Sequence, residues 1–178
     1  MFDNIVERLM GVITLKAPVY RTIAEDPEAT KPAGIIVAVV ALIQGFCVGL
    51  AASANIGTAI LQAGVNLVLS LIAWFVSSWL LAAIAKAFGG KTDTQEMLRV
   101  TGHVFIFNLA GILILATLIS PALSCATSII ALAILVLSLI GYFIGVREAA
   151  EFTTGKAIIT AILAAIASFI ITGPLGGL

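Results

Sequence analysis

Five long apolar stretches contain no Asp, Glu, Lys or Arg, and they constrain the fold of this chain more than any other feature. They lie at about residues 34–54, 58–85, 100–119, 125–146 and 157–172. A bilayer core is about 30 Å thick, and a helix of about 20 apolar residues crosses it. Each stretch is apolar on both faces, whereas the strands of a β-barrel alternate. The pattern therefore predicts an all-α, polytopic membrane protein with five transmembrane helices.

The composition agrees with a membrane protein. Hydrophobic residues make up 61% of the 178 residues and charged residues 10%, whereas soluble domains average about 45–50% and about 25%. The formal net charge is zero, which disfavours a nucleic-acid partner, because such proteins carry a basic face. We divide the chain into a cytoplasmic, amphipathic segment, residues 1–32, and a five-helix transmembrane domain, residues 33–178.

The charged residues all lie in three segments between or before the apolar stretches. The nine Lys and Arg fall before residue 34, between 86 and 99, and between 147 and 156, and so do the nine Asp and Glu. Because Lys and Arg concentrate in cytoplasmic loops, we expect the N-terminus inside and the C-terminus outside. The opposite face carries only short neutral turns, so we expect partners in water to bind the cytoplasmic face.

The first 31 residues predict two short helices. Apolar residues recur at helical spacing in the first of them: Phe2, Ile5, Val6, Leu9, Val12 and Ile13. This pattern is typical of an amphipathic helix that lies in the membrane interface or packs its apolar face under the bundle. The second helix runs from Pro18 to about Asp26, with Tyr20 as an apolar contact. Glu25 and Asp26 could bind a basic partner surface, or they form a solvated turn.

A capped helix start precedes the third stretch. Thr92 or Asp93 is followed three residues later by Gln95 or Glu96, the spacing of a capping box. This helix is expected to begin in the cytoplasm and to enter the membrane near His103. That histidine could titrate near neutral pH, or it has a structural role at the interface.

Several amides lie within the apolar stretches. Gln62, Asn66 and Ser70 lie four residues apart and share one helix face, while Gln44 and Asn108 lie on other stretches. Buried amides need hydrogen-bond partners, and such bonds between helices contribute about 0.6–2 kcal/mol. They predict either structural hydrogen bonds or a polar track for a solute or proton. The stretches lack the carboxylates and cations that coupled transporters use.

Small residues recur four apart on three of the stretches. The sets are Ala41, Gly45, Gly49 and Ser53; Gly141 and Gly145; and Ala157, Ala161, Ala165, Ser168 and Thr172. Such ladders let helices approach closely. They predict a tight bundle, in which one ladder could instead be the interface of a homo-oligomer.

The sequence predicts no catalytic, cofactor or metal site. Cys47 and Cys125 are the only cysteines and His103 is the only histidine, too few for a metal site built from thiolates or imidazoles. Ser77 and Ser78 have no acid–base partner at membrane depth. We therefore expect that the protein is not an enzyme.

Three segments resemble the Yip family, the Ypt/Rab-interacting integral membrane proteins, in its compact prokaryotic form. They are residues 17–27, a proline-led segment that ends in an acidic-Pro turn; residues 89–100; and Gly102 with His103 at the head of the third stretch. Members often carry Gly-Tyr there and a proline four residues later. This chain has His103 in place of the tyrosine and Asn108 in the proline region.

The resemblance implies a non-enzymatic membrane scaffold or adaptor, in the plasma membrane of a prokaryote, that organises the membrane or partner proteins. Eukaryotic relatives are adaptors in vesicle traffic that contact small GTPases. This chain lacks their long N-terminal arm and the Asp-Leu-Tyr-Gly-Pro-type motif, so a small-GTPase partner is not expected. The expected partners are the lipid bilayer and a protein or a second copy of the chain. The alternatives are a small-solute channel or transporter that uses the amides and an accessory subunit of a larger complex.

Overall fold

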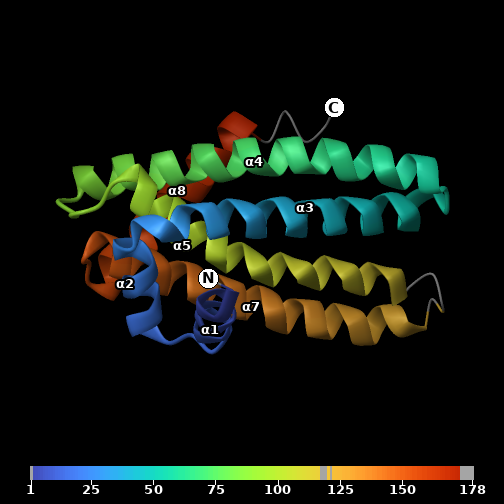
Figure 1. Cartoon of the computed structure of the whole chain (residues 1–178), viewed down its shortest axis with the longest axis horizontal. Coiled ribbons are helices and arrows are strands. Elements are labelled where there is room, and N and C mark those ends of the chain that lie inside the picture. The colour runs from blue at the N-terminus through green and yellow to red at the C-terminus, as the bar shows by residue number, and fades with distance from the viewer. Residues whose placement is uncertain (1, 117–119, 121, 173–178) are drawn as a thin grey trace.

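Every regular element in the part of the chain that the structure describes is a helix, and that part contains no strand (Figure 1). The computed structural model describes residues 2–116, 120 and 122–172. In chain order the helices are α1 (Phe2–Ile13), α2 (Ala17–Glu25), η1 (Pro27–Ala29), α3 (Thr30–Ser53), α4 (Ile56–Ala87), α5 (Thr94–Val104), η2 (Phe105–Leu115), α7 (Leu123–Ala150) and α8 (Thr154–Thr172). The predicted all-α class is confirmed.

Five helical segments in the described ranges are long and apolar enough to cross a membrane. They are Pro27–Ser53, Ile56–Ala87, Thr94–Leu115, Leu123–Ala150 and Thr154–Ile171. The five predicted spans are confirmed by length and composition, although residues 117–119 of the third lie outside the described residues. At about 1.5 Å per residue, the 32 residues of α4 extend beyond a bilayer core of about 30 Å.

Local sequence sets the helix ends. The Asp93 carboxylate accepts a hydrogen bond from the Glu96 backbone N–H at 2.8 Å, and the Glu96 carboxylate accepts one from the Asp93 N–H at 3.3 Å. The predicted capping box at the start of α5 is therefore confirmed. At the start of α4, the Asn55 side chain accepts bonds from two backbone N–H groups of the first turn.

The third span changes its winding halfway. The sequence predicts one α-helix through this stretch, whereas the structure continues α5 as the 3₁₀ helix η2 from Phe105 to Leu115. A 3₁₀ helix rises about 2.0 Å per residue, so these 11 residues cover about 22 Å. The narrower coil also places Gly111 against α3, where an added Cβ would lie 2.9 Å from Gln44 Cγ. The span therefore crosses a bilayer with few residues and packs closely on α3.

The helices α3 and α4 pack antiparallel through the first small-residue ladder. A Cβ at Gly45 would lie 2.7 Å from the backbone oxygen of Gln62, and a Cβ at Gly49 would lie 2.8 Å from Ala59 Cα. Across the same contact, Asn66 Nδ2 donates a hydrogen bond to the Ala41 carbonyl at 2.7 Å. This ladder is therefore covered within the chain at Ala41, Gly45 and Gly49, whereas Ser53 is exposed.

The second ladder receives the N-terminal region. A Cβ at Gly141 would lie 2.9 Å from the Tyr20 hydroxyl oxygen, and one at Gly145 would lie 2.4 Å from Val100 Cγ1. Tyr20 is fully buried, and its hydroxyl donates to the Val12 carbonyl at 2.9 Å. The two glycines of α7 thus make room for α2 and α5 rather than for another chain.

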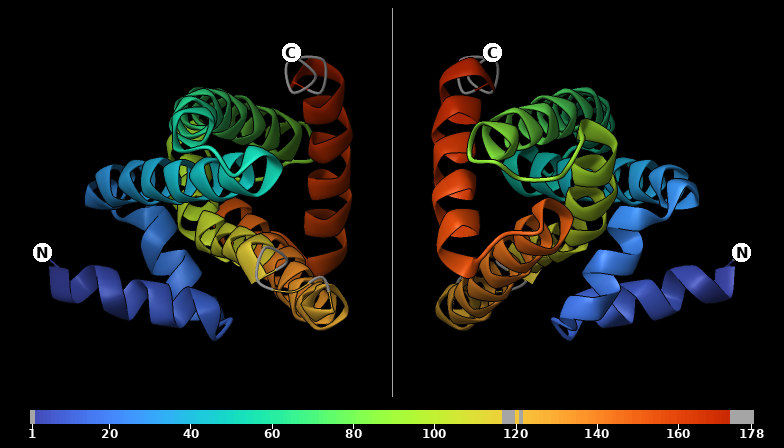
Figure 2. Two further views of the ribbon diagram at one scale, coloured as in Figure 1. Left: turned by 90° about the vertical axis from the view of Figure 1, so that its right-hand side faces the viewer. Right: turned by 90° about the vertical axis from the view of Figure 1, so that its left-hand side faces the viewer.

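The last helix is steeply inclined to the other long helices, which Figure 2 shows from both ends of the bundle. It packs on α4 and α7 with Ala157, Ala161 and Ala164 buried, whereas the predicted ladder member Ala165 is exposed. The predicted ladder is wrong at this position because steps of four residues drift by about 40° per step around a helix of 3.6 residues per turn. Steps of four and then three stay on one face.

The short N-terminal helices lie outside the bundle of long helices. Figure 2 shows α1 running across the direction of α3 and α4, with α2 leading from it to the bundle. Figure 1 places α2, the loop between α4 and α5, and the turn between α7 and α8 at the same end of the molecule. The opposite end carries the α3–α4 turn, where Ser53, Ala54 and Asn55 are neutral.

Candidate functional site

Ion pairs join the N-terminal helices to the loops at one end of the bundle. Arg21 of α2 pairs with Glu25 and with Glu151, both at 2.7 Å, and Lys91 lies 3.6 Å from Glu151. The hydrogen bond from Arg21 lowers the pKa of the Glu151 carboxyl. These contacts link α2, the α4–α5 loop and the end of α7. We call this end of the bundle the charged end.

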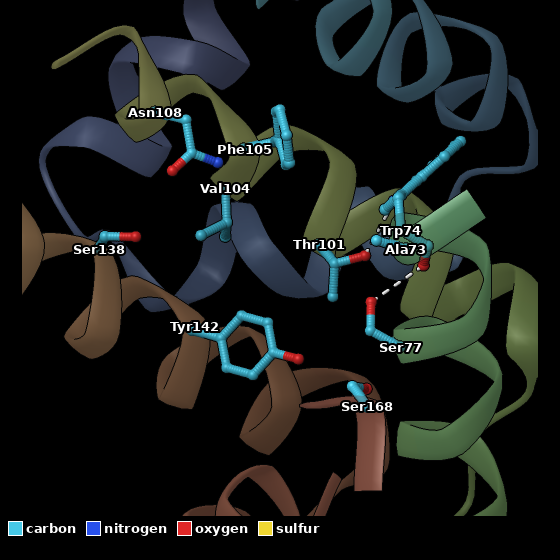
Figure 3. A pocket seen from close by; sticks show the side chains of 10 residues that line it. All are labelled: Ala73, Trp74, Ser77, Thr101, Val104, Phe105, Asn108, Ser138, Tyr142 and Ser168. Carbon is cyan, nitrogen blue, oxygen red and sulfur yellow. Dashed lines mark hydrogen bonds between the residues drawn. The ribbon is translucent and has the colours of Figure 1, made fainter. Parts of the chain in front are cut away.

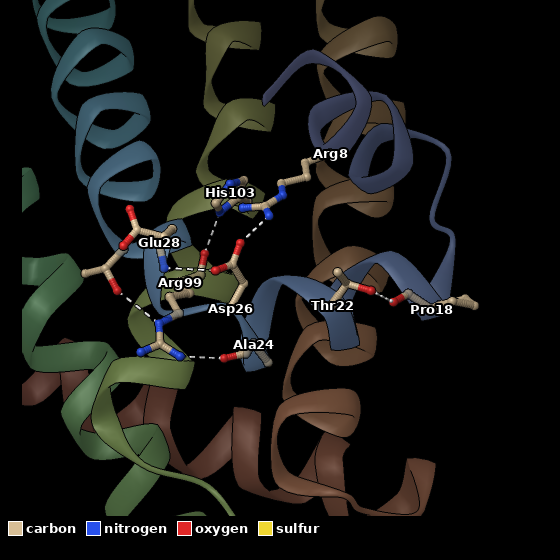
Figure 4. Close-up of polar contacts among 9 residues, drawn as sticks. Arg8, Pro18, Thr22, Ala24, Asp26, Glu28, Arg99 and His103 are labelled. Carbon is tan, nitrogen blue, oxygen red and sulfur yellow. Dashed lines mark hydrogen bonds and ion pairs between the residues drawn. The ribbon is translucent and has the colours of Figure 1, made fainter. Parts of the chain in front are cut away.

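A second group of contacts fastens α1 and α2 to α5 (Figure 4). Arg8 of α1 forms an ion pair with Asp26, and its hydrogen bond to that carboxylate lowers the pKa of Asp26. Arg99 donates from Nε to Thr30 Oγ1 at 2.9 Å and from Nη1 to the Ala24 carbonyl at 2.7 Å. Arg8 and Arg99 therefore hold the junction between α2 and α3, from Ala24 to Thr30.

His103 is fully buried behind this group. Its Nδ1 donates to the Arg99 carbonyl at 2.7 Å, because a carbonyl oxygen only accepts. In a neutral ring, Nε2 is then the unprotonated nitrogen. Within the described residues Nε2 has no hydrogen-bond partner. Next to it, Gly102 is needed for the contact between α5 and α3, since an added Cβ would lie 2.7 Å from Ala33 Cβ.

The predicted partner-binding residues at this end are engaged within the chain. Tyr20 is buried against α7, Glu25 pairs with Arg21, and Asp26 pairs with Arg8. Gly102 and His103 are buried as well. These side chains build the charged end. Tyr20, Gly102 and His103 are covered, whereas the Glu25 side chain is exposed beside its partner Arg21.

A cavity of about 260 Å³ lies between α4, α5, η2, α7 and α8. Figure 3 shows polar side chains from all five elements around it. Its hydroxyl and amide groups belong to Ser77, Thr101, Asn108, Ser138, Tyr142 and Ser168. Of the described residues, no Asp, Glu, Lys or Arg lines it. The cavity can therefore accept an uncharged group that forms hydrogen bonds.

Part of this lining is fixed by hydrogen bonds. Trp74 Nε1 donates to Thr101 Oγ1 at 3.0 Å, and Thr101 Oγ1 donates to the Met97 carbonyl at 2.7 Å. Ser77 Oγ donates to the Trp74 carbonyl at 3.0 Å. These bonds hold the α4 and α5 walls in place.

The predicted amides do not form one track. Asn108 lies at the cavity, whereas Asn66 is used in the α3–α4 contact. Gln44 packs beside Gly111, and Gln62 is exposed on α4. The structure therefore separates the one amide at the cavity from the amides of the α3–α4 hairpin.

Sequence reasoning missed most of the cavity. Thr101 lies on the third span and Ser138 and Tyr142 on the fourth, and only the packing of these spans brings the three side chains to one cavity. One signal was present: Ser138 and Tyr142 lie four residues apart and share a face of α7. Such a pair on an otherwise apolar helix can mark a polar site.

The structure defines a helical integral membrane protein with five apolar spans and a short N-terminal helical segment docked at its charged end. The family described as the Yip1 domain matches residues 10–173. The chain belongs to this family, as the resemblance in its sequence implied. No curated protein and no solved structure matches the chain.

Proposed function

We propose that this protein is a non-enzymatic scaffold or adaptor in the plasma membrane of a prokaryote, acting through its charged end on the cytoplasmic side. Membership of the Yip1 domain family supports a membrane role of this kind. The distribution of Lys and Arg supports the orientation, because all nine lie in segments at or before the charged end. At the opposite end of the bundle, the neutral α3–α4 turn offers few groups to a partner in water.

The observation that carries the proposal is the two-sided surface of α1. Val12, on the inner face of α1, is fully buried. Val6, Met10 and Ile13, on its outer face, are exposed by 63%, 56% and 42%. The exposed residues follow helical spacing and form one row, which we call the outer row of α1. A row of this kind on a helix that lies across the spans is suited to the membrane interface or to an apolar partner surface (Figure 2).

The fold holds this helix firmly in position. Arg8 points from α1 to Asp26, while Val12 accepts the hydrogen bond from Tyr20 with its carbonyl. One face of α1 is thus tied to the bundle and the outer row is left free. We propose that the outer row attaches the charged end to the membrane surface, where partners assemble.

The test is purification of the full chain in mild detergent, with mass spectrometry of the protein and lipid that accompany it. Val6→Glu with Met10→Glu should lower the enrichment of these associates several-fold, since two carboxylates would have to enter an apolar surface. Ile56→Glu is the matched control, because Ile56 is an exposed apolar residue at the opposite end, and it should retain the associates. Equal enrichment in both variants would contradict the role of α1.

The alternative function, a small-solute channel, would depend on a continuous row of polar side chains. Its strongest support is the uncharged polar cavity, but Asn66 is engaged in the α3–α4 contact and Gln62 is exposed elsewhere on α4. We therefore propose the scaffold in preference to the channel. Solute flux into liposomes above that of empty liposomes, lost on Asn108→Leu, would reverse this preference.

A further inference from the structure

We propose that the cavity between α4, α5, η2, α7 and α8 binds the head of a membrane lipid that is uncharged and bears a free hydroxyl, of the diacylglycerol type. The inference requires only that the protein spans a membrane, and it is independent of the scaffold role. Figure 3 shows the residues that would surround such a head group.

Unused hydrogen-bonding groups are the first support. The side chains of Asn108, Ser138 and Tyr142 form no hydrogen bond with any other described residue, and all three line the cavity. Polar groups in a membrane cost several kcal/mol when they are left without a partner, so these groups favour an occupant. The two hydroxyls and the amide both donate and accept, which matches an alcohol with neighbouring ester carbonyls.

The absence of charge defines the head group. The nearest arginine in the chain, Arg99, lies two residues from Thr101 but donates to Thr30 and Ala24. No cation among the described residues lines the cavity. A phosphate would enter it without a counter-charge, at a large desolvation cost. The cavity therefore selects an uncharged head over a phosphorylated one.

The depth of the cavity suits a lipid head. Thr101 lies between Arg99 and His103 of the charged end, and Tyr142 lies five residues before Arg147, about 7.5 Å along α7. Its polar wall therefore begins within about one and a half helical turns of charged side chains. A lipid whose head lies there belongs to the leaflet at the charged end.

The surroundings leave a path for acyl chains. The cavity is partly open, and α4 and α7 each pack far more extensively on α8 than on each other. Beyond the cavity, toward the neutral end, exposed apolar side chains such as Ile72 and Leu135 cover α4 and α7. Acyl chains that leave the cavity can lie between these two helices, in contact with the bilayer.

The two tryptophans give an internal probe and its control. Trp74 lines the cavity, whereas Trp79 is 52% exposed on the same helix. The full chain carrying Trp79→Phe would be placed in phosphatidylcholine nanodiscs and titrated with diacylglycerol brominated near the head end of its acyl chains. We expect saturable quenching of Trp74 fluorescence. The protein carrying Trp74→Phe should show only a linear, non-saturable quenching of Trp79.

Competition defines the ligand class. Unlabelled diacylglycerol should reverse the quenching of Trp74, while phosphatidic acid with the same acyl chains should not. Free glycerol tests for a site that takes a soluble polyol instead. Reversal by phosphatidic acid at equal mole fraction, reversal by glycerol, or non-saturable quenching of Trp74 would each overturn the proposal.

Substitutions locate the site. Asn108→Leu should raise the half-saturating mole fraction about three- to tenfold, the loss of one hydrogen bond. Gln62→Leu removes an exposed amide outside the cavity and should leave the titration unchanged. Ala73→Leu narrows the cavity without removing a polar group, and it should weaken binding even if Asn108→Leu does not fold. Unchanged binding in a folded Ala73→Leu protein would contradict the assigned position.

Discussion

Glycines determine how closely the helices of this protein approach each other. In the α3–α4 hairpin, Gly45 lies against backbone atoms of α4, whereas Gly64 has no atom within 4 Å of an added Cβ. Both residues lie inside apolar stretches, but only Gly45 belongs to a predicted small-residue ladder. The packing shows that its neighbour is the backbone of α4.

The contrast gives a first prediction. Gly45→Ala should lower the free energy of unfolding by about 1–3 kcal/mol, because its Cβ would lie 2.7 Å from the Gln62 carbonyl oxygen. Gly64→Ala should be neutral or stabilising by up to about 1 kcal/mol, because alanine favours a helix over glycine. Thermal unfolding of both variants in the same detergent measures the difference. Equal losses would show that this contact does not determine the stability of the hairpin.

At the scale of the element, α8 was predicted as a helix and as a span, but its buried face was only partly predicted. Ala157 and Ala161 are buried as expected, whereas Ala164 is buried in place of Ala165. Its steep inclination was not predictable, because an alanine-rich helix that is apolar all round can pack at many angles.

The position of α8 is tested by substitutions four residues apart. Ala161→Leu should destabilise the protein by about 1–3 kcal/mol, since the larger side chain must enter a closed contact. Residue 165 is exposed, so Ala165→Leu should change the free energy of unfolding by less than about 0.5 kcal/mol. Thermal unfolding distinguishes them, and a larger loss in the second variant would contradict this orientation of α8.

The attachment of α1 is expected to depend on pH. The hydrogen bond from Arg8 lowers the pKa of Asp26 in the folded protein. The ion pair therefore stabilises the fold above the unfolded pKa of about 3.9, and this contribution is lost as the pH falls through the folded pKa.

Asp26→Asn should accordingly be less stable than the unmodified protein by up to about 1 kcal/mol at pH 7, a modest value because the pair is partly solvated. The gap should narrow once the pH falls below about 3.9, because the unfolded carboxyl is then protonated. Unfolding curves measured from pH 7 to pH 3 test this, with Glu28→Gln, an exposed carboxylate nearby, as the control. A gap of the same size at pH 3 as at pH 7 would mean that the asparagine acts by another route.

At the scale of the whole molecule, the charged side chains that are distant in the chain meet at one end. Arg21 and Glu151 are 130 positions apart and form one ion pair. The sequence predicted that these segments share a side of the membrane, because all Lys and Arg lie in three segments and such residues concentrate in cytoplasmic loops. It did not predict which charges pair, because pairing depends on how α2 docks on α7.

The orientation in the membrane is the fourth prediction. In a protein with Cys47→Ala and Cys125→Ala, a cysteine is introduced either at Gly57, near the neutral end, or at Gly155, in the turn at the charged end; both positions are exposed. A membrane-impermeant maleimide applied to intact cells should label the cysteine of Gly57→Cys. It should label that of Gly155→Cys only after permeabilisation. The reverse pattern would place the charged end outside.

The amino-acid sequence was enough to predict the class of protein, the five spans, the two short N-terminal helices and the capping box of α5. These follow from local rules: uninterrupted apolar length, helical spacing, and cap residues that bond within their own turn. The tertiary structure alone decided which neighbour covers each glycine ladder, how α8 crosses the bundle, and which polar groups meet in a cavity. In a membrane every apolar face is compatible with lipid, so hydropathy does not rank the possible packings. Close steric fit at positions such as Gly45 and Gly145 ranks them instead.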